Sequence, residues 1–126
     1  MALSALIDAI RHQEETLILD RCDEDVAWRL GSMLREWGAA DSLPIVIDIG
    51  LFHRRLFFSA LPGSTPDNID WARRKRNVVE RYQCSSYRIG RELVAKNDTL
   101  TNRYGLPFSD FADHGGGFPL TLAGVA

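Results

Sequence analysis

One lysine stands out because helical spacing places it among apolar side chains. Projection of the surrounding segment on a helix puts Lys75 between Trp71 and Val78, inside an apolar stripe instead of opposite it. A buried ammonium requires a partner, so one interpretation is a cation directed at a carboxylate or phosphate in a pocket. The other is an aliphatic stem that packs while its ammonium extends past the helix start to water. The spacing is compatible with both.

A histidine followed by three glycines is the second chemical feature. The order His114, Gly115, Gly116, Gly117 is typical of the esterase loop that directs backbone N–H groups at developing negative charge. An esterase also needs a G-x-S-x-G nucleophile turn, and the sequence contains none. The glycines therefore indicate positive φ and tight packing, with a turn that contacts an anionic ligand as the alternative.

Basic residues follow the predicted helix from Arg73 onward. Arg74, Arg81 and Arg88 recur every seven residues and would line one side, where an anionic ligand could lie. The alternative is a solvated face paired with neighbouring acids. The 15 basic and 17 acidic residues give a net charge of −2, so neither nucleic acid nor a membrane is expected as a partner.

Metal and cofactor motifs are absent from the sequence. The three histidines are scattered, and the acids at positions 20–25 are explained by capping of a helix start, so no metal site is expected. Neither a P-loop nor a dinucleotide fingerprint occurs. Cys22 and Cys84 lack CxxC spacing, which favours reduced thiols in a cytoplasmic protein.

The first half of the chain predicts two helices, a strand and a hairpin. Apolar spacing indicates a helix over Leu3–Gln13 and a short strand over Thr16–Leu19. Asp23 is predicted to cap the next helix, which ends at Gly38. Its predicted buried stripe is Val26, Leu30, Met33, Leu34 and Trp37. A strand over Ile45–Ile49 and a second through Leu56–Phe58 then predict a hairpin.

The second half predicts one long helix and a set of turns. A loop over Leu61–Asn68 leads to a helix over Asp70–Lys96, in which Gly90 indicates close approach of another backbone or a ligand. A short helix and loop are expected within Thr99–Asp113. His114–Pro119 is a special turn, and Leu120–Val125 begins a strand. Because the chain stops at Ala126 within that strand, we expect it to be truncated.

These elements describe an α+β protein, and the 126 residues fit one domain spanning 1–126. Apolar runs stay shorter than the ~18 residues that cross a bilayer. Three segments together resemble an uncharacterised family of the haem-degrading (HbpS-like) and GlcG-like superfamily. They are Pro66–Trp71 followed by Arg73–Lys75, then Ser85–Tyr87, and His114–Pro119.

The resemblance covers nearly the whole chain and implies a profilin-like fold, an antiparallel sheet with packed helices, assembled into homo-oligomers. Members of this superfamily continue with a further strand and a closing helix. The family pattern implies a ligand pocket, and haem enters as a cofactor only through the superfamily name. The corresponding positions here are Asp67, Asn68, Trp71, Arg74, Lys75, Ser85, Ser86, His114, Gly115, Gly116 and Gly117.

Three functional hypotheses follow. The leading one is a cytoplasmic homo-oligomer that binds a small anionic or haem-like ligand between the long helix and the His114 turn. The second is an enzyme in which Lys75 or His114 acts in acid–base or electrostatic catalysis. The third is a non-catalytic assembly or adaptor protein, in which the same motifs form subunit contacts.

Overall fold

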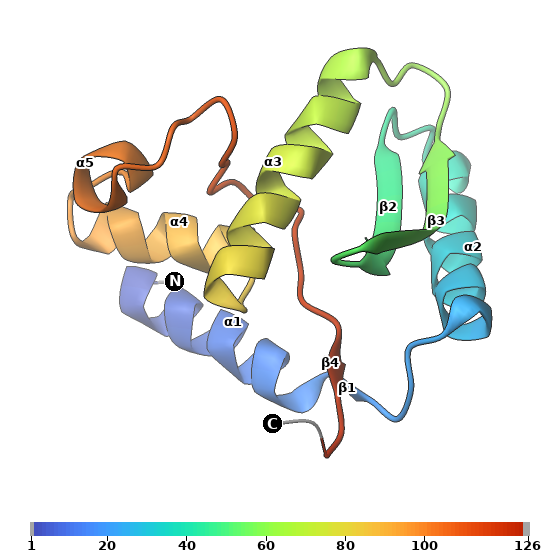
Figure 1. Ribbon diagram of the computed structural model, residues 1–126, viewed down its shortest axis with the longest axis horizontal. Coiled ribbons are helices and arrows are strands. Elements are labelled where there is room, and N and C mark those ends of the chain that lie inside the picture. Colours follow the sequence, from blue (N-terminus) through green and yellow to red (C-terminus); the bar gives the residue numbers. More distant parts are fainter. Residues whose placement is uncertain (1, 125–126) are drawn as a thin grey trace. The chain divides into compact units, whose positions relative to one another are not determined.

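The computed structural model describes residues 2–124 and divides into two compact units. One unit combines Met1–Leu19 with Arg73–Ala126, and the other is Asp20–Ala72. Figure 1 shows the helices and strands that each unit contains. The mixed helical and antiparallel-sheet class predicted from the sequence is confirmed. The single domain over residues 1–126 stays a prediction.

The Asp20–Ala72 unit packs a helix on a β-hairpin (Figure 1). Helix α2 spans Glu24–Ala40, and Asp23 caps it as predicted by accepting a hydrogen bond from the Val26 amide at 2.9 Å. Strands β2 (Val46–Leu51) and β3 (Arg54–Ala60) pair antiparallel, which confirms the predicted hairpin. Their buried core consists of Ala27, Ile47, Ile49, Phe57 and Leu61.

The buried face of α2 differs from the predicted apolar stripe. The buried positions are Ala27, Gly31 and Gly38, whereas Met33 and Trp37 are 45% and 61% exposed. A Cβ at Gly31 would overlap the Phe57 ring, so small residues let the helix approach the hairpin closely. The helix does not end at Gly38, as predicted, but continues to Ala40. Gly38 packs so closely against Leu61 and Ile45 that the position requires a glycine.

The other unit is mainly helical. It contains α1 (Leu3–Thr16), the Arg73–Tyr82 part of α3 (Pro66–Tyr82), α4 (Ser86–Ala95) and α5 (Leu100–Tyr104). Helices α1 and α4 lie side by side (Figure 1). Strands β1 (Ile18–Leu19) and β4 (Thr121–Leu122) form a short parallel pair. The core consists of Val78, Cys84, Ile89, Leu93, Leu100 and Leu106.

The single helix predicted over Asp70–Lys96 is two helices. Gln83 adopts a left-handed φ of 56°, and Ser85 then caps α4 by accepting a hydrogen bond from the Arg88 amide at 3.1 Å. Helix α3 also begins earlier than predicted, at Pro66, a residue suited to the first helical position. Arg74 and Arg88 therefore belong to different helices, and the predicted row of basic residues along one helix side is wrong.

The remaining short elements follow the prediction with narrower bounds. The predicted strand over Thr16–Leu19 keeps only its last two residues, because Thr16 ends α1 and its hydroxyl donates to the His12 carbonyl at 2.8 Å. Helix α5 confirms the short helix. The strand predicted from Leu120 comprises Thr121–Leu122, and Val125 lies outside the described residues. Within residues 2–124, each helix is too short or too polar to cross a lipid bilayer.

Candidate functional site

Lys75 and the His114–Gly117 segment, here called the glycine turn, are neighbours within one unit. Gly116 has a φ of 133°, which a residue with a side chain rarely adopts. A Cβ on Gly116 would lie 3.1 Å from the Lys75 Nζ and 3.2 Å from its Cδ. The lysine head and stem therefore both lie against the backbone of the turn, and a larger residue at position 116 would displace them.

The N-terminus of α4 holds the glycine turn in place. The Ser86 side chain is fully buried, and its hydroxyl donates to the His114 carbonyl at 2.6 Å and accepts from the Gly117 amide at 2.9 Å. The Ser86 amide donates to the Gly117 carbonyl at 3.0 Å. Gly117 is itself closely packed, since a Cβ there would lie 2.9 Å from a methyl group of Val79. Ser86 thus fixes both ends of the turn to the helix.

The electrostatic environment of Lys75 suits an anion. The side chain is half-buried, and the loss of hydration lowers the pKa of its ammonium below the ordinary value. Next to it, His114, Gly115 and Gly116 are exposed to solvent. A carboxylate that approached the turn would meet a cation whose hydration is already reduced, which favours pairing.

Two aromatic rings lie next to the glycine turn. The Phe108 ring is 51% exposed and lies edge-on to the His114 imidazole, with 6.2 Å between the ring centres. Tyr87 is 39% exposed, and its ring would lie 3.4 Å from a Cβ on Gly115. The sequence-based set did not include either ring, because Tyr87 and Phe108 show no spacing that sets them apart from core aromatics.

Arg74 fastens the segment that precedes the turn. Its side chain is 7% exposed, and its Nε donates to the Phe108 carbonyl at 2.9 Å. The guanidinium also lies 4.3 Å from the centre of the Phe108 ring, a cation–π contact. The Arg74 carbonyl accepts from the Ala112 amide at 3.1 Å. Through these contacts, Arg74 holds residues 108–112 in place.

Ser85 acts at the start of α4 and is joined to α1. Its amide donates to Glu14 Oε2 at 2.8 Å, and the Arg88 Nε lies 3.2 Å from Glu14 Oε1. The second contact is an ion pair without the angle of a good hydrogen bond. Glu14 has a side chain only 9% exposed, and sequence reasoning missed it because nothing in α1 distinguishes it from Glu15. The cluster stabilises the helix that carries Ser86.

The remaining predicted site residues belong to the other unit. Asp67, Asn68 and Trp71 lie in the first turns of α3, within Asp20–Ala72. The Asn68 side chain accepts from the Thr65 amide at 2.8 Å and so caps the helix start, while Asp67 is exposed. Of the predicted set, the structure brings together Lys75, Ser86, His114, Gly115, Gly116 and Gly117.

Cys22 and Cys84 are both free, and Cys84 is buried, where desolvation raises the pKa of its thiol. Among residues 2–124, no three His, Cys, Asp or Glu side chains lie close enough together to hold a metal ion.

Comparison with protein families finds a matching model. The family described as "Haem degrading protein HbpS-like" matches residues 22–126. A UPF0303 protein of Pseudomonas entomophila is 49% identical over 125 residues, covering 99% of this chain and 69% of the relative. A UPF0303 protein of Paraburkholderia phymatum is 48% identical over 119 residues, covering 94% of this chain and 72% of the relative.

A solved structure shows the same fold. The crystal structure of the Ybr137w protein aligns with a TM-score of 0.84 and 25% sequence identity, over 94% of this chain and 69% of that chain. The alignment includes residues from both compact units, because neither unit alone accounts for 94% of the chain. The resemblance to a superfamily of α+β proteins, first seen in three short sequence segments, is thereby confirmed.

Proposed function

Because this chain belongs to the HbpS-like family, we propose that it binds a small anionic ligand at Lys75 and the glycine turn. The observation that carries the proposal is the contact between Lys75 and the backbone of Gly116. A desolvated ammonium beside an exposed turn with adjacent aromatic rings offers charge and apolar surface to the same small molecule.

Calorimetry with a defined set of anions tests the proposal. The probes are acetate, pyruvate, benzoate, succinate and inorganic phosphate, added to the full chain. We expect at least one carboxylate to bind, and Lys75→Gln to weaken that binding by about tenfold, the effect of losing one charge-assisted contact. Lys96→Gln is the matched control, since Lys96 is the chain's other lysine and is exposed at the end of α4. Equal affinities of the two variants would contradict the proposal.

Haem belongs in the same screen because of the matched family's description. If haem bound at the turn, His114 would be the candidate iron ligand and Lys75 the candidate partner of a propionate. Bound haem would supply redox and oxygen chemistry. A Soret band that shifts on mixing with the protein, and that changes in His114→Ala, would support haem as the ligand. An unchanged spectrum of haem would remove it.

A second candidate function is an enzyme, and the environment of Lys75 favours it. Burial lowers the pKa of the ammonium, which brings the neutral amine closer to physiological pH, where an amine can act as base or nucleophile. The test is turnover of any carboxylate that binds. Loss of turnover in both Lys75→Gln and His114→Gln, with binding retained in the second, would support catalysis. Unchanged turnover in both variants would argue against it.

The proposal also includes a cytoplasmic homo-oligomer, supported by the family resemblance and by two cysteines that are both free. Light scattering coupled to gel filtration measures the mass directly, and the monomer mass is 14.2 kDa. A mass several times larger is expected. If an oligomer buries Asp67–Lys75 between subunits and no anion binds, the same motifs serve assembly instead of ligand binding.

A further inference from the structure

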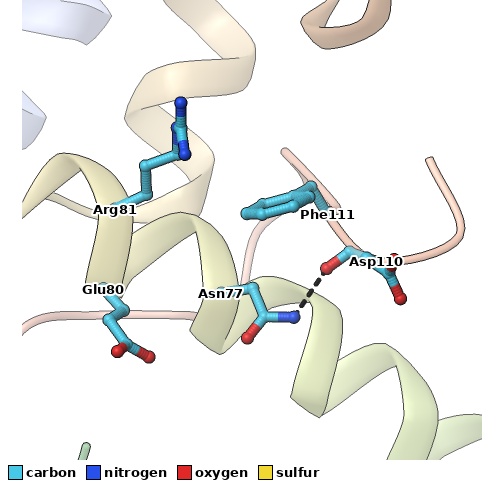
Figure 2. A pocket seen from close by; sticks show the side chains of 5 residues that line it. All are labelled: Asn77, Glu80, Arg81, Asp110 and Phe111. Atoms are coloured by element: carbon cyan, nitrogen blue, oxygen red, sulfur yellow. Dashed lines mark hydrogen bonds between the residues drawn. The ribbon is translucent and has the colours of Figure 1, made fainter. Parts of the chain in front are cut away.

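A shallow depression lies beside α3 and is lined by none of the residues of the glycine turn. Its volume is about 500 Å³, enough for a small molecule. Figure 2 shows the opening between Arg81 and the Asn77 amide, with the Phe111 ring facing it. The lining residues are Asn77, Glu80, Arg81, Asp110 and Phe111.

The wall formed by residues 109–111 is held firmly to α3. The Asn77 amide nitrogen donates to the Asp110 carbonyl at 2.7 Å, as drawn in Figure 2. Arg73 Nη1 pairs with Asp110 Oδ1 at 3.1 Å, and Arg73 Nη2 donates to the Ser109 carbonyl at 2.9 Å. Phe111 packs against the core cluster that includes Val78. The depression is therefore formed before any ligand arrives, which lowers the entropic cost of binding.

The polar groups around the Phe111 ring are of both signs. The Arg81 guanidinium lies 5.9 Å from the centre of the neighbouring Tyr82 ring, and neither Arg81 nor Glu80 forms an ion pair within residues 2–124. The Asn77 carboxamide oxygen stays an acceptor after its nitrogen has been used. The charges of Glu80 and Asp110 are balanced by Arg81 and by Arg73, so the rim as a whole is neutral.

The neutral rim presents a cation, carboxylates and an aromatic ring. A ligand that carries an anion, a cation and an apolar group would be complementary to it. We propose that this depression binds a free α-amino acid with an apolar side chain. Its carboxylate pairs with Arg81, a geometry in which guanidinium makes two parallel hydrogen bonds. Its ammonium is held by the Glu80 carboxylate and the Asn77 carboxamide oxygen, and its side chain packs on Phe111. Neither Lys75 nor a residue of the glycine turn lines this depression.

Amide chemical shifts in the ¹⁵N-labelled full chain test this directly. Titration with L-phenylalanine and L-leucine is expected to shift the resonances of Asn77, Arg81 and Phe111. Arg81→Gln should weaken binding by about tenfold, as expected for one charge-assisted contact at an exposed rim. Arg29→Gln is the control, because Arg29 is an exposed arginine on α2 in the other unit. Shifts confined to other residues, or an Arg81→Gln variant that binds equally well, would overturn the assignment.

Two blocked compounds test whether the depression recognises a free amino acid or the end of a peptide. N-acetyl-L-phenylalanine keeps the carboxylate and lacks the ammonium, whereas L-phenylalaninamide keeps the ammonium and lacks the carboxylate. Both are expected to bind at least about tenfold more weakly than L-phenylalanine, because each loses one of the two charged contacts. If either blocked compound binds as tightly as L-phenylalanine, the depression does not recognise a free amino acid.

Discussion

The backbone carbonyl of Asp113 occupies the space that a Cβ on Gly90 would fill. Gly90 lies inside α4, and Asp113 immediately precedes the glycine turn, so the contact joins the helix and the turn without any side chain between them. Because the obstacle is backbone, it cannot move aside as a flexible side chain would. This contact sets how closely residues 113–117 approach α4.

Gly90→Ala should destabilise the protein even though alanine is the better helix former. The gain in helix propensity is roughly 1 kcal/mol, while forcing the backbone of residue 113 away costs more, so we expect a net loss of about 1–3 kcal/mol. Urea denaturation of both proteins measures the difference. Gly105→Ala provides a comparison in which alanine is strained by the backbone conformation and not by a close contact. The φ of Gly105 is 70°, and nothing lies within 4 Å of its Cβ position. A Gly90→Ala midpoint equal to wild type would contradict the close contact.

Ser86→Ala should loosen the glycine turn. The substitution leaves the His114 carbonyl without its donor and the Gly117 amide without its acceptor, at a cost of about 1–3 kcal/mol. Hydrogen exchange of the Gly117 amide should accelerate more than exchange in the α4 core. Ser109→Ala, at an exposed position, should change neither the stability of the protein nor the exchange rate of the Gly117 amide. Slow exchange of Gly117 in the Ser86 variant would mean that the turn is held by packing alone.

The free energy of unfolding of Lys75→Met, taken relative to wild type, should fall as pH rises. Burial lowers the pKa of Lys75 in the folded state, so between that pKa and the ordinary value of 10.5 the unfolded chain binds more protons. The cost of burying the ammonium is fully present below the folded-state pKa, and it falls as pH approaches 10.5. Urea midpoints at pH 7, 8, 9 and 10 measure the trend. A difference between variant and wild type that is constant with pH would contradict desolvation of this ammonium.

Glu14→Gln should detach α1 from the start of α4. The carboxylate accepts from the Ser85 amide and pairs with Arg88, and a glutamine of the same shape keeps at most a neutral hydrogen bond. Loss of the charged partner should cost about 1–3 kcal/mol, measured by urea denaturation. Glu15→Gln is the matched control at the next residue, which is exposed. Equal stabilities of the two variants would show that the buried pair contributes nothing net, as some buried pairs do.

Local signals in the sequence predicted most elements of the fold correctly. Asp23 caps a helix because a carboxylate before a run of acidic and apolar residues satisfies free amides, whatever else surrounds it. The β-branched run at 45–49 forms a strand of the predicted hairpin for the same local reason. Gly90 was interpreted as a point of close approach, and Asp113 occupies that position.

The errors arose where distant residues decide the structure. The periodic spacing of residues 70–96 is continuous, and nothing in it reveals that Gln83 takes a left-handed conformation. In α2, an apolar stripe was expected to face the core, but the Phe57 ring lies so close to Gly31 that a side chain there would overlap it, and Ala27 is buried in the same cluster. Helical periodicity identifies a helix, whereas the face that is buried depends on the shape of its partner.

The sequence by itself determined which residues cap helices, which segment forms the hairpin, and that Lys75 and the glycines at 115–117 are unusual. Only the tertiary structure decided that these two features are neighbours and that Ser86 holds the glycine turn on α4. It also decided that Asp67, Asn68 and Trp71 belong to a different compact unit. The physical reason is range: capping, turn chemistry and strand propensity act within a few residues, whereas a site is formed by packing between segments about 30–40 residues apart along the chain.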